Sequence, residues 1–140
     1  NMQTTLIVIG AIVVILMVFR VVAMSKMKNT PLVADHEKVL ILTDKNFQQQ
    51  TKNKVVLVDF WASWCAPCRM MAPVINDVAS ELKGNSHVGK VDIQQYQDLA
   101  NRFKVRSIPT MILFKNGNEV KRFVGIKSKE FLLNEIEKEK

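Results

Sequence analysis

The sequence predicts an α/β fold in which a mixed central sheet is flanked by helices and preceded by one N-terminal hydrophobic helix. Three observations lead to this prediction. From Val39 onward, short apolar runs typical of strands alternate with segments of helical periodicity. The last two strand candidates are joined by Asn116 and Gly117, a pair that favours an antiparallel hairpin. An uncharged run from Leu6 to Phe19 precedes all of them. Alternating strands and helices that end in a hairpin give a mixed sheet with helices on both faces.

The predicted elements follow one another in a regular order. Strands are expected at 39–42, 55–60, 88–93, 110–114 and 120–124. Helices are expected at 44–51, from the cysteines to about Lys83, at 97–103 and after Ser128, which is a favourable N-cap residue. In the long helix, apolar side chains recur at helical spacing on one face: Ala72, Ile75, Ala79 and Leu82.

The first 24 residues are predicted to be a transmembrane anchor. Residues 4–24 contain one charge, Arg20, and nearly match the roughly 20 residues that a membrane span requires. Arg20 lies close enough to the end to reach the headgroups. A cleaved signal peptide and a partner-bound helix remain alternatives, although a signal peptide would carry basic residues before its apolar run, and residues 1–5 have none.

The basic residues near this segment follow it, at Arg20, Lys26 and Lys28. By the positive-inside rule this order places the C-terminal side in the cytoplasm, with the extracytoplasmic orientation left open for a single span. Residues 25–38 are polar, contain a proline and are interpreted as a linker. Residues 39–140 then form one modest domain, since the chain has 140 residues and is 48% hydrophobic.

The net charge of +7 does not indicate nucleic-acid binding. Residues 1–34 hold three basic and no acidic residues, so the remainder carries 17 basic against 13 acidic residues. No run of lysine and arginine interleaved with aromatic residues occurs in the predicted domain. A solvated basic surface explains this balance.

Two cysteines, Cys65 and Cys68, are the only thiols of the chain, and they indicate redox chemistry. A disulfide between them closes a very short loop, which would add little stability. The pair follows the buried strand 55–60 and opens a helix, where unpaired N–H groups and the helix dipole favour a thiolate. Cys65 is therefore predicted to be the attacking thiol and Cys68, one turn further in, the resolving thiol.

The spacing of Cys65 and Cys68 is also typical of half of a zinc site, which is the competing interpretation. Structural zinc needs four ligands, and only His36 and His87 remain to supply the others. His36 falls in the predicted linker and His87 near the start of a strand. We therefore expect no metal site.

Several motifs in order resemble the thioredoxin family over residues 39–138. They are VDFWASWCAPCRMMAP at 58–73, the strand from Lys90 to Asp92, RSIPT at 106–110, FKNG at 114–117 and VGI at 124–126. The family has glycine where Ala66 stands and commonly where Ser107 stands. The resemblance implies the thioredoxin fold and a protein-disulfide reductase with no bound cofactor.

The resemblance also implies roles for Asp59 and Lys90. Asp59 interrupts an apolar strand, where an ionised carboxylate is costly unless it is paired or protonated. In the family, the matching aspartate helps to move the proton of the second cysteine, here Cys68, and the matching lysine is its charge partner, here Lys90. The alternatives are a core aspartate held by backbone donors and a surface lysine.

The family resemblance further implies that the bond between Ile108 and Pro109 is cis, an ordinary trans proline being the alternative. Trp61 matches a tryptophan that packs under the site. A flat apolar surface around the cysteines would accept many protein disulfides without a deep pocket. Its residues, by the same resemblance, are Trp64, Ala66, Pro67, Ile108, Pro109, Val124, Gly125 and Ile126.

The resulting hypothesis is a membrane-anchored, monomeric thioredoxin that reduces disulfides in protein substrates. By resemblance it is re-reduced by thioredoxin reductase, with NADPH as the ultimate donor. A second hypothesis is an extracytoplasmic reductant of exported or cytochrome-maturation thiols. A third is a non-catalytic membrane adaptor that uses the apolar surface to hold partners.

Overall fold

The computed structural model describes residues 1–28 and 30–140 of the chain. They divide into two compact units, with the boundary between Thr30 and Pro31. Asn29, which falls in the predicted linker 25–38, lies outside the described residues.

The first unit consists of one helix, α1 (Met2–Lys28), which extends four residues beyond the predicted end at Met24. Its stretch from Met2 to Lys26 is long and apolar enough to cross a membrane, a criterion that a signal sequence near an N-terminus also meets. Apolar side chains surround this helix on all sides rather than forming one stripe. A helix with this pattern suits an apolar environment better than the surface of a water-soluble domain.

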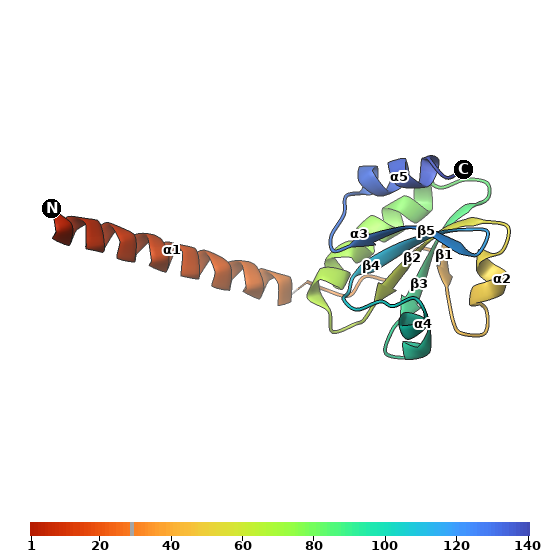
Figure 1. The fold of residues 1–140 in the computed structure, drawn as a ribbon, viewed down its shortest axis with the longest axis horizontal. Helices are drawn as coiled ribbons and strands as arrows, with labels where there is room; N and C mark the ends of the chain where they lie inside the picture. The colour runs from red at the N-terminus through yellow and green to blue at the C-terminus, as the bar shows by residue number, and fades with distance from the viewer. Residues whose placement is uncertain (29) are drawn as a thin grey trace. The chain divides into compact units, whose positions relative to one another are not determined.

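The second unit is built on a five-stranded sheet with the order β1-β3-β2-β4-β5 (Figure 1). The three strands β1, β3 and β2 are parallel, whereas β4 and β5 run antiparallel to their neighbours. The strands are β1 (Val39–Ile41), β2 (Val55–Trp61), β3 (Ser86–Asp92), β4 (Thr110–Lys115) and β5 (Asn118–Val124). The predicted mixed sheet is thereby confirmed.

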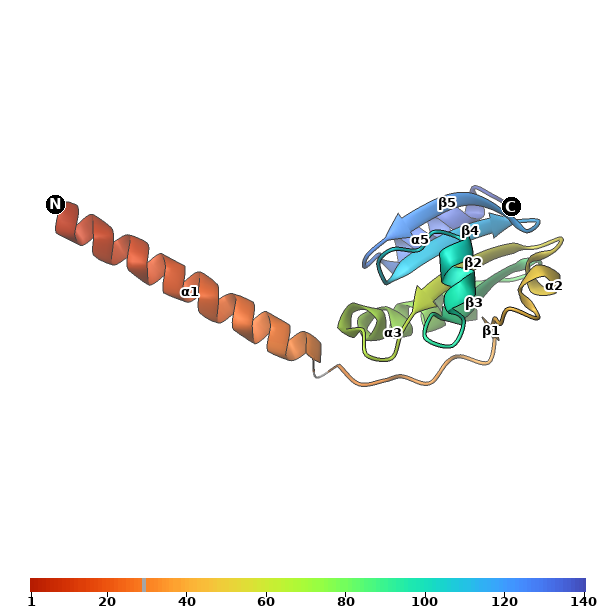
Figure 2. The same ribbon diagram turned by 60° about the horizontal axis from the view of Figure 1, so that its bottom comes forward.

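Helices cover both faces of this sheet (Figures 1 and 2). On one face lie α3 (Ala66–Glu81) and α5 (Lys129–Glu137), and on the other lie α2 (Phe47–Thr51) and α4 (Gln97–Arg102). The four apolar positions predicted for one face of the long helix are all buried.

The central strand β2 contributes side chains to two hydrophobic cores, one on each face of the sheet. Its residues are almost all buried, and they alternate between the faces as the pleat requires. Val55 and Leu57 pack beneath α3, whereas Val56, Val58 and Phe60 pack toward α2 and α4. The same alternation puts Asp59 on the face that α3 covers.

Four phenylalanines fill the core on the α2 and α4 side. Phe103 lies 5.0 Å, centroid to centroid, from both Phe47 and Phe114, and 6.1 Å from Phe60. Three of the four ring contacts in this cluster are edge-on. Such pairs add roughly 0.5–1.5 kcal/mol each beyond their buried area, so this cluster fixes the short helices α2 and α4 against the sheet.

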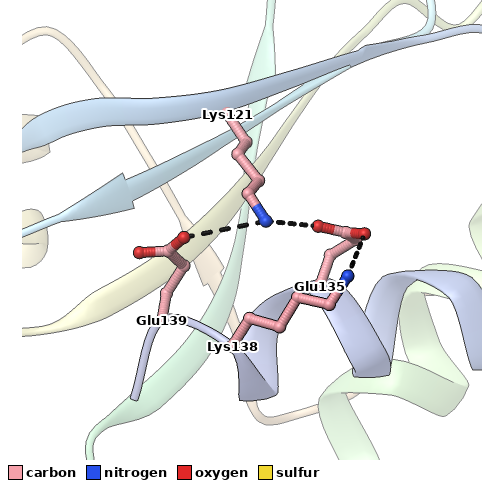
Figure 3. A network of polar contacts seen from close by, with 4 residues as sticks. All are labelled: Lys121, Glu135, Lys138 and Glu139. Carbon is pink, nitrogen blue, oxygen red and sulfur yellow. Dashed lines mark hydrogen bonds and ion pairs between the residues drawn. The ribbon is translucent and has the colours of Figure 1, made fainter.

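The helix α5 packs on the sheet through apolar side chains, and ion pairs lie along its edge. Leu132 and Ile136 are fully buried against the sheet. Around them, the Lys121 ammonium lies 2.6 Å from Glu135 and 3.7 Å from Glu139, while Lys138 lies 3.1 Å from Glu135 (Figure 3). Because these ion pairs stay in contact with water, they contribute less to the stability of α5 than its two buried side chains do.

The turns and caps follow the sequence closely. Asn116 and Gly117 have φ angles of 51° and 80° and connect β4 to β5, as the predicted hairpin requires. The Ser128 hydroxyl accepts a hydrogen bond of 3.2 Å from the N–H of Phe131, which caps α5.

The predicted helix at 44–51 is wrong at its start, because α2 begins only at Phe47. The Asn46 side chain accepts a hydrogen bond of 2.7 Å from the N–H of Thr43 and donates one of 3.0 Å to the Ile41 carbonyl. The Thr43 hydroxyl in turn accepts from the N–H of Asn46. The Phe47 N–H also donates a hydrogen bond of 3.0 Å to the Thr43 carbonyl, so a single helical turn precedes α2, and the reciprocal bonds between Thr43 and Asn46 cap it.

Gly89 of β3 gives a test of the packing on the α2 side of the sheet. A Cβ atom there would lie 2.5 Å from Cδ1 and 3.0 Å from Cγ of Leu42. We expect Gly89→Ala to lower the free energy of unfolding by about 1–3 kcal/mol, the usual cost of overpacking. Urea denaturation of the full chain in detergent measures it.

The control is the same substitution in a Leu42→Ala background, where the clashing atoms are gone. There we expect Gly89→Ala to cost clearly less. An equal cost in both backgrounds would place its origin outside the contact with Leu42.

Candidate active site

The two cysteines lie just after the end of β2, at the start of α3. Cys65 is the N-cap residue of α3, with the extended backbone that an N-cap adopts, and Pro67 occupies the first turn. The Cys65 Sγ atom accepts a hydrogen bond of 3.2 Å from the backbone N–H of Cys68. An N–H group aimed at this sulfur, together with the positive end of the helix dipole, favours the thiolate form of Cys65.

Cys65 and Cys68 are joined by a disulfide, with their Cα atoms 5.2 Å apart. Both residues are buried, Cys65 at 6% exposure and Cys68 at 2%. The cysteines pack with Ala62, and Trp61 and Ile108 lie against this group. The two cysteines therefore lie at the start of the helix, and Cys65 is slightly the more exposed of the two.

The loop before β4 lies beside the disulfide. The peptide bond between Ile108 and Pro109 is cis, as expected. The Ile108 carbonyl oxygen lies 3.8 Å from the Cys65 Sγ atom. Two hydrogen bonds hold this loop, one of 2.6 Å from the Thr110 hydroxyl to the Ser107 carbonyl and one of 2.9 Å from the Gly125 N–H to the Pro109 carbonyl.

The apolar residues expected around the site differ in exposure. Trp64, Val124 and Ile126 are 60%, 54% and 50% exposed, which is unusual for large apolar side chains. Ala66, Pro67, Ile108 and Gly125 are half-buried and Pro109 is buried. The bond between Gly125 and Pro109 ties the segment 124–126 to the loop beside Cys65. The exposed members thus form the part of this surface that a partner could touch.

Asp59 is a buried acid on the same face of the sheet as α3. It is 1% exposed, and its Oδ1 atom has no hydrogen-bond partner among the described residues. Burial raises the pKa of Asp59 to about 7, a nearby Lys90 works in the opposite direction, and Asp35 adds to the increase. Asp59 can therefore change its protonation near neutral pH.

Lys90 is the expected charge partner of Asp59, and its charge does act on that carboxyl, but its ion pair is formed with Asp35. Lys90 is 5% exposed and its ammonium lies 2.6 Å from Asp35 and 4.1 Å from the centre of the Trp61 ring. Asp35 keeps 31% of its side chain exposed. An ion pair that keeps one partner in contact with water loses less solvation than one that buries both charges, which favours Asp35 over Asp59 as the partner of this lysine.

Asp35 was not predicted as a site residue, because it falls in the predicted linker 25–38. No motif or periodicity sets it apart from the other polar residues there. Its contact with Lys90 joins residues 55 positions apart and becomes visible only in the folded chain.

The zinc interpretation finds no support in the described part of the chain. No group of three or more histidine, cysteine, aspartate or glutamate side chains there could hold a metal ion. The His36 ring accepts a hydrogen bond from the Lys38 N–H, whereas His87 lies on β3. Both cysteines are bonded to each other.

A hollow of about 380 Å³ lies away from the disulfide, beside Val55 at the start of β2. Cys65 and Cys68 follow the opposite end of this strand. The hollow therefore lies away from the disulfide and is not part of the candidate active site.

Comparison with known proteins identifies relatives of the second unit. The family model described as Thioredoxin matches residues 38–138. A thioredoxin of Chlamydia pneumoniae is 48% identical over 100 residues, which cover 71% of this chain and 97% of that protein. A bifunctional thioredoxin reductase/thioredoxin of Mycobacterium leprae is 48% identical over 97 residues, 68% of this chain and 21% of that protein. The structure of a mutant thioredoxin from Halobacterium salinarum superposes with a TM-score of 0.68 at 34% identity, covering 76% of this chain and 95% of that one.

The raised pKa of Asp59 predicts how stability depends on pH. The folded-state pKa of about 7 lies above the ordinary value of 3.8, so the folded protein keeps a proton between these pH values that the unfolded chain releases. The free energy of unfolding therefore falls as the pH rises through this window. We expect the stability advantage of Asp59→Asn to be smallest near pH 4 and to grow by roughly 3–4 kcal/mol by pH 8.

Urea denaturation of the oxidised chain at several pH values measures this difference. Asp77→Asn, which removes an exposed carboxylate from α3, is the matched control and should follow the wild type. Parallel pH profiles for wild type and Asp59→Asn would mean that Asp59 does not titrate in this range.

Proposed function

The chain belongs to the thioredoxin family, and from this premise we propose that it is a membrane-tethered reductant of protein disulfides with its domain in the cytoplasm. Its activity as a thiol-disulfide oxidoreductase follows from the family and from its Cys65 and Cys68 pair. The observation that carries the proposal is the position of this disulfide at the N-terminus of α3, beside the loop 107–110.

In the first proposed step, the Cys65 thiolate attacks one sulfur of a substrate disulfide. A bond forms between the Cys65 Sγ and that sulfur, while the substrate disulfide breaks and its second sulfur leaves as a thiolate that takes a proton from water. The N–H of Cys68 and the dipole of α3 support this step, because both stabilise negative charge on Cys65.

In the second proposed step, Cys68 releases the reduced substrate. Its thiol gives its proton to the Asp59 carboxylate, directly or through water, and the thiolate attacks the Cys65 Sγ. The bond between Cys65 and the substrate sulfur breaks, the substrate leaves as its thiolate, and the disulfide of the chain is restored. A pKa of about 7 suits Asp59 to accept and return a proton at neutral pH.

The substrate class follows from the surface around the disulfide. Trp64, Val124 and Ile126 offer exposed apolar area. The Ile108 carbonyl, close to the Cys65 sulfur, can accept a hydrogen bond from an extended backbone. We propose that this surface, together with Ala66, Pro67, Pro109 and Gly125, receives extended segments of many disulfide-containing proteins.

Thioredoxins work without a bound cofactor, because the dithiol itself carries the electrons. The partners of the family are thioredoxin reductase and disulfide-containing proteins. We propose that such a reductase, with NADPH as the ultimate donor, re-reduces this chain. The Mycobacterium leprae relative, whose name joins both activities in one protein, supports this pairing.

The membrane tether is proposed from α1. Its apolar stretch is long enough for a span, and the basic residues Arg20, Lys26 and Lys28 follow the apolar run. We propose residues 1–24 as the anchor, a linker at 25–38, and a monomeric domain at 39–140. An extracytoplasmic domain that reduces exported thiols is the alternative, and the same helix would serve it.

The exchange mechanism predicts different failures for the two cysteines. With dithiothreitol as electron donor and insulin as substrate, Cys65→Ser should lose at least about 100-fold in reduction rate, because it lacks the attacking sulfur. Cys68→Ser should lose turnover too. When it is reduced beforehand and mixed with insulin after dithiothreitol is removed, it should accumulate a mixed disulfide between Cys65 and substrate, visible on a non-reducing gel.

Ser80→Ala, an exposed change elsewhere on α3, is the control and should keep wild-type activity. Turnover by Cys65→Ser, or a mixed disulfide formed through Cys68 instead of Cys65, would contradict the assignment. A non-catalytic adaptor would hold its partners equally well with both cysteines replaced by serine.

The anchor and its orientation are tested in cells. After a permeant phosphine reduces the disulfide, a membrane-impermeant maleimide should label Cys65 in lysed cells and leave it unlabelled in intact cells. Alkaline carbonate should leave the full chain in the membrane fraction and release a variant that lacks residues 2–28. Equal labelling of intact cells would reverse the orientation, and release of the full chain would remove the anchor.

A further inference from the structure

One side chain of α3 holds the segment that precedes β1. The Asn76 side-chain amide donates a hydrogen bond of 2.8 Å to the Ala34 carbonyl, and its Oδ1 atom accepts one of 2.8 Å from the N–H of His36. These two bonds bracket Asp35 on both sides. The backbone of Asp35 is therefore fixed to the helix that also carries Cys65 and Cys68.

This clamp directs Asp35 to a buried cation. The Asp35 Oδ1 atom lies 2.6 Å from the Lys90 ammonium, which also stacks on the ring of Trp61. Lys90 is the register partner of Asp59 on the neighbouring parallel strand, so both side chains rise from the same face of the sheet. The ion pair thus stands next to the proposed proton acceptor.

The charges around Asp59 come from few groups. Lys90 on β3 lowers the pKa of Asp59, and Asp35 raises it. From β4 the register partner of Asp59 is the uncharged Met111. On α3, the buried Cys68 carries no charge in the disulfide, and the charges that act on the pKa of Asp59 are those of Lys90 and Asp35. Asp92 and Tyr96 line the same small pocket as Asp35 and Lys90, further from Asp59 along the sheet.

We propose that Asp35, held in place by Asn76, is a positioning residue of the exchange reaction, acting through Lys90 on the proton transfer between Cys68 and Asp59. With Asp35 ionised, Asp59 faces a neutral ion pair instead of a bare ammonium. Asp35 touches none of the reacting atoms. The segment between α1 and β1 is then part of the catalytic electrostatics as well as a connection. This inference rests on the proposed role of Asp59 as proton acceptor.

The direct test is the titration of Asp59 itself. Carboxyl resonances of the oxidised full chain, labelled with ¹³C at its aspartates in detergent micelles, are followed against pH, and Asp59→Asn identifies the signal. In Asp35→Asn we expect the midpoint of Asp59 to fall by about 0.5–1 pH unit, because Lys90 loses its counter-charge. Asp35→Glu should restore most of the wild-type midpoint, and Asn76→Ala should lower it by a smaller amount.

The matched control is Glu37→Gln, which removes the same charge two positions further along the same segment, at an exposed site. Its Asp59 midpoint should equal that of the wild type. The pH profile of insulin reduction should move with the titration, so that the low-pH limb shifts downward in Asp35→Asn and stays in place in Glu37→Gln.

The outcomes separate this inference from the proposed function. An Asp59 midpoint that stays unchanged or rises in Asp35→Asn and in Asn76→Ala would overturn the role of Asp35, while the cysteine variants still report the exchange reaction. Because the NMR readout requires no turnover, it holds even if the substitutions slow catalysis. An Asp59→Asn chain with wild-type rates at every pH would instead overturn the proton-acceptor role on which the inference rests.

Discussion

The packing of α3 on the central sheet is the constraint on which the site depends. Met71, Ile75 and Val78 of this helix are fully buried against the face that carries Leu57 and Met111. Burial of this kind contributes roughly 1.5–3 kcal/mol for each large apolar side chain. It fixes the N-terminus of α3 at the end of β2, and with it the sulfurs, the loop 107–110 and the buried Asp59. A looser helix would leave the same residues in the sequence without bringing them together.

A second consequence of this packing is the electrostatic character of the site. Among the described residues, the buried charged side chains beneath α3 are Asp59 and Lys90, and mostly apolar side chains surround them. Such surroundings keep the dielectric low and let single charges act strongly. Desolvation favours the neutral acid, and the ammonium favours the carboxylate. These opposing effects leave the pKa of Asp59 at about 7. At neutral pH the exchange of a proton with a thiol then costs little. The ion pair with Asp35 enters this balance because Asn76 connects its backbone to α3.

The apolar surface beside the disulfide and the apolar helix α1 point to two different environments. Trp64, Val124 and Ile126 are exposed side chains from two separate segments beside the site. Residues 6–19 form a continuous uncharged run, whose exposure to water would be far more costly. The different grouping of apolar residues therefore distinguishes α1, which is long and apolar enough to cross a membrane, from the domain that carries the disulfide.

The sequence alone determined the order of the elements, the hairpin at Asn116 and Gly117, the two reactive cysteines and the family, because periodicity, turn chemistry and local motifs are properties of neighbouring residues. The start of α2 was predicted three residues too early, because a single turn capped by Thr43 and Asn46 precedes the regular helix. The partner of Lys90 was missed for a different reason. Which carboxylate meets a buried ammonium depends on contacts between segments 55 positions apart and on how much water each acid retains, and only the tertiary structure decides both.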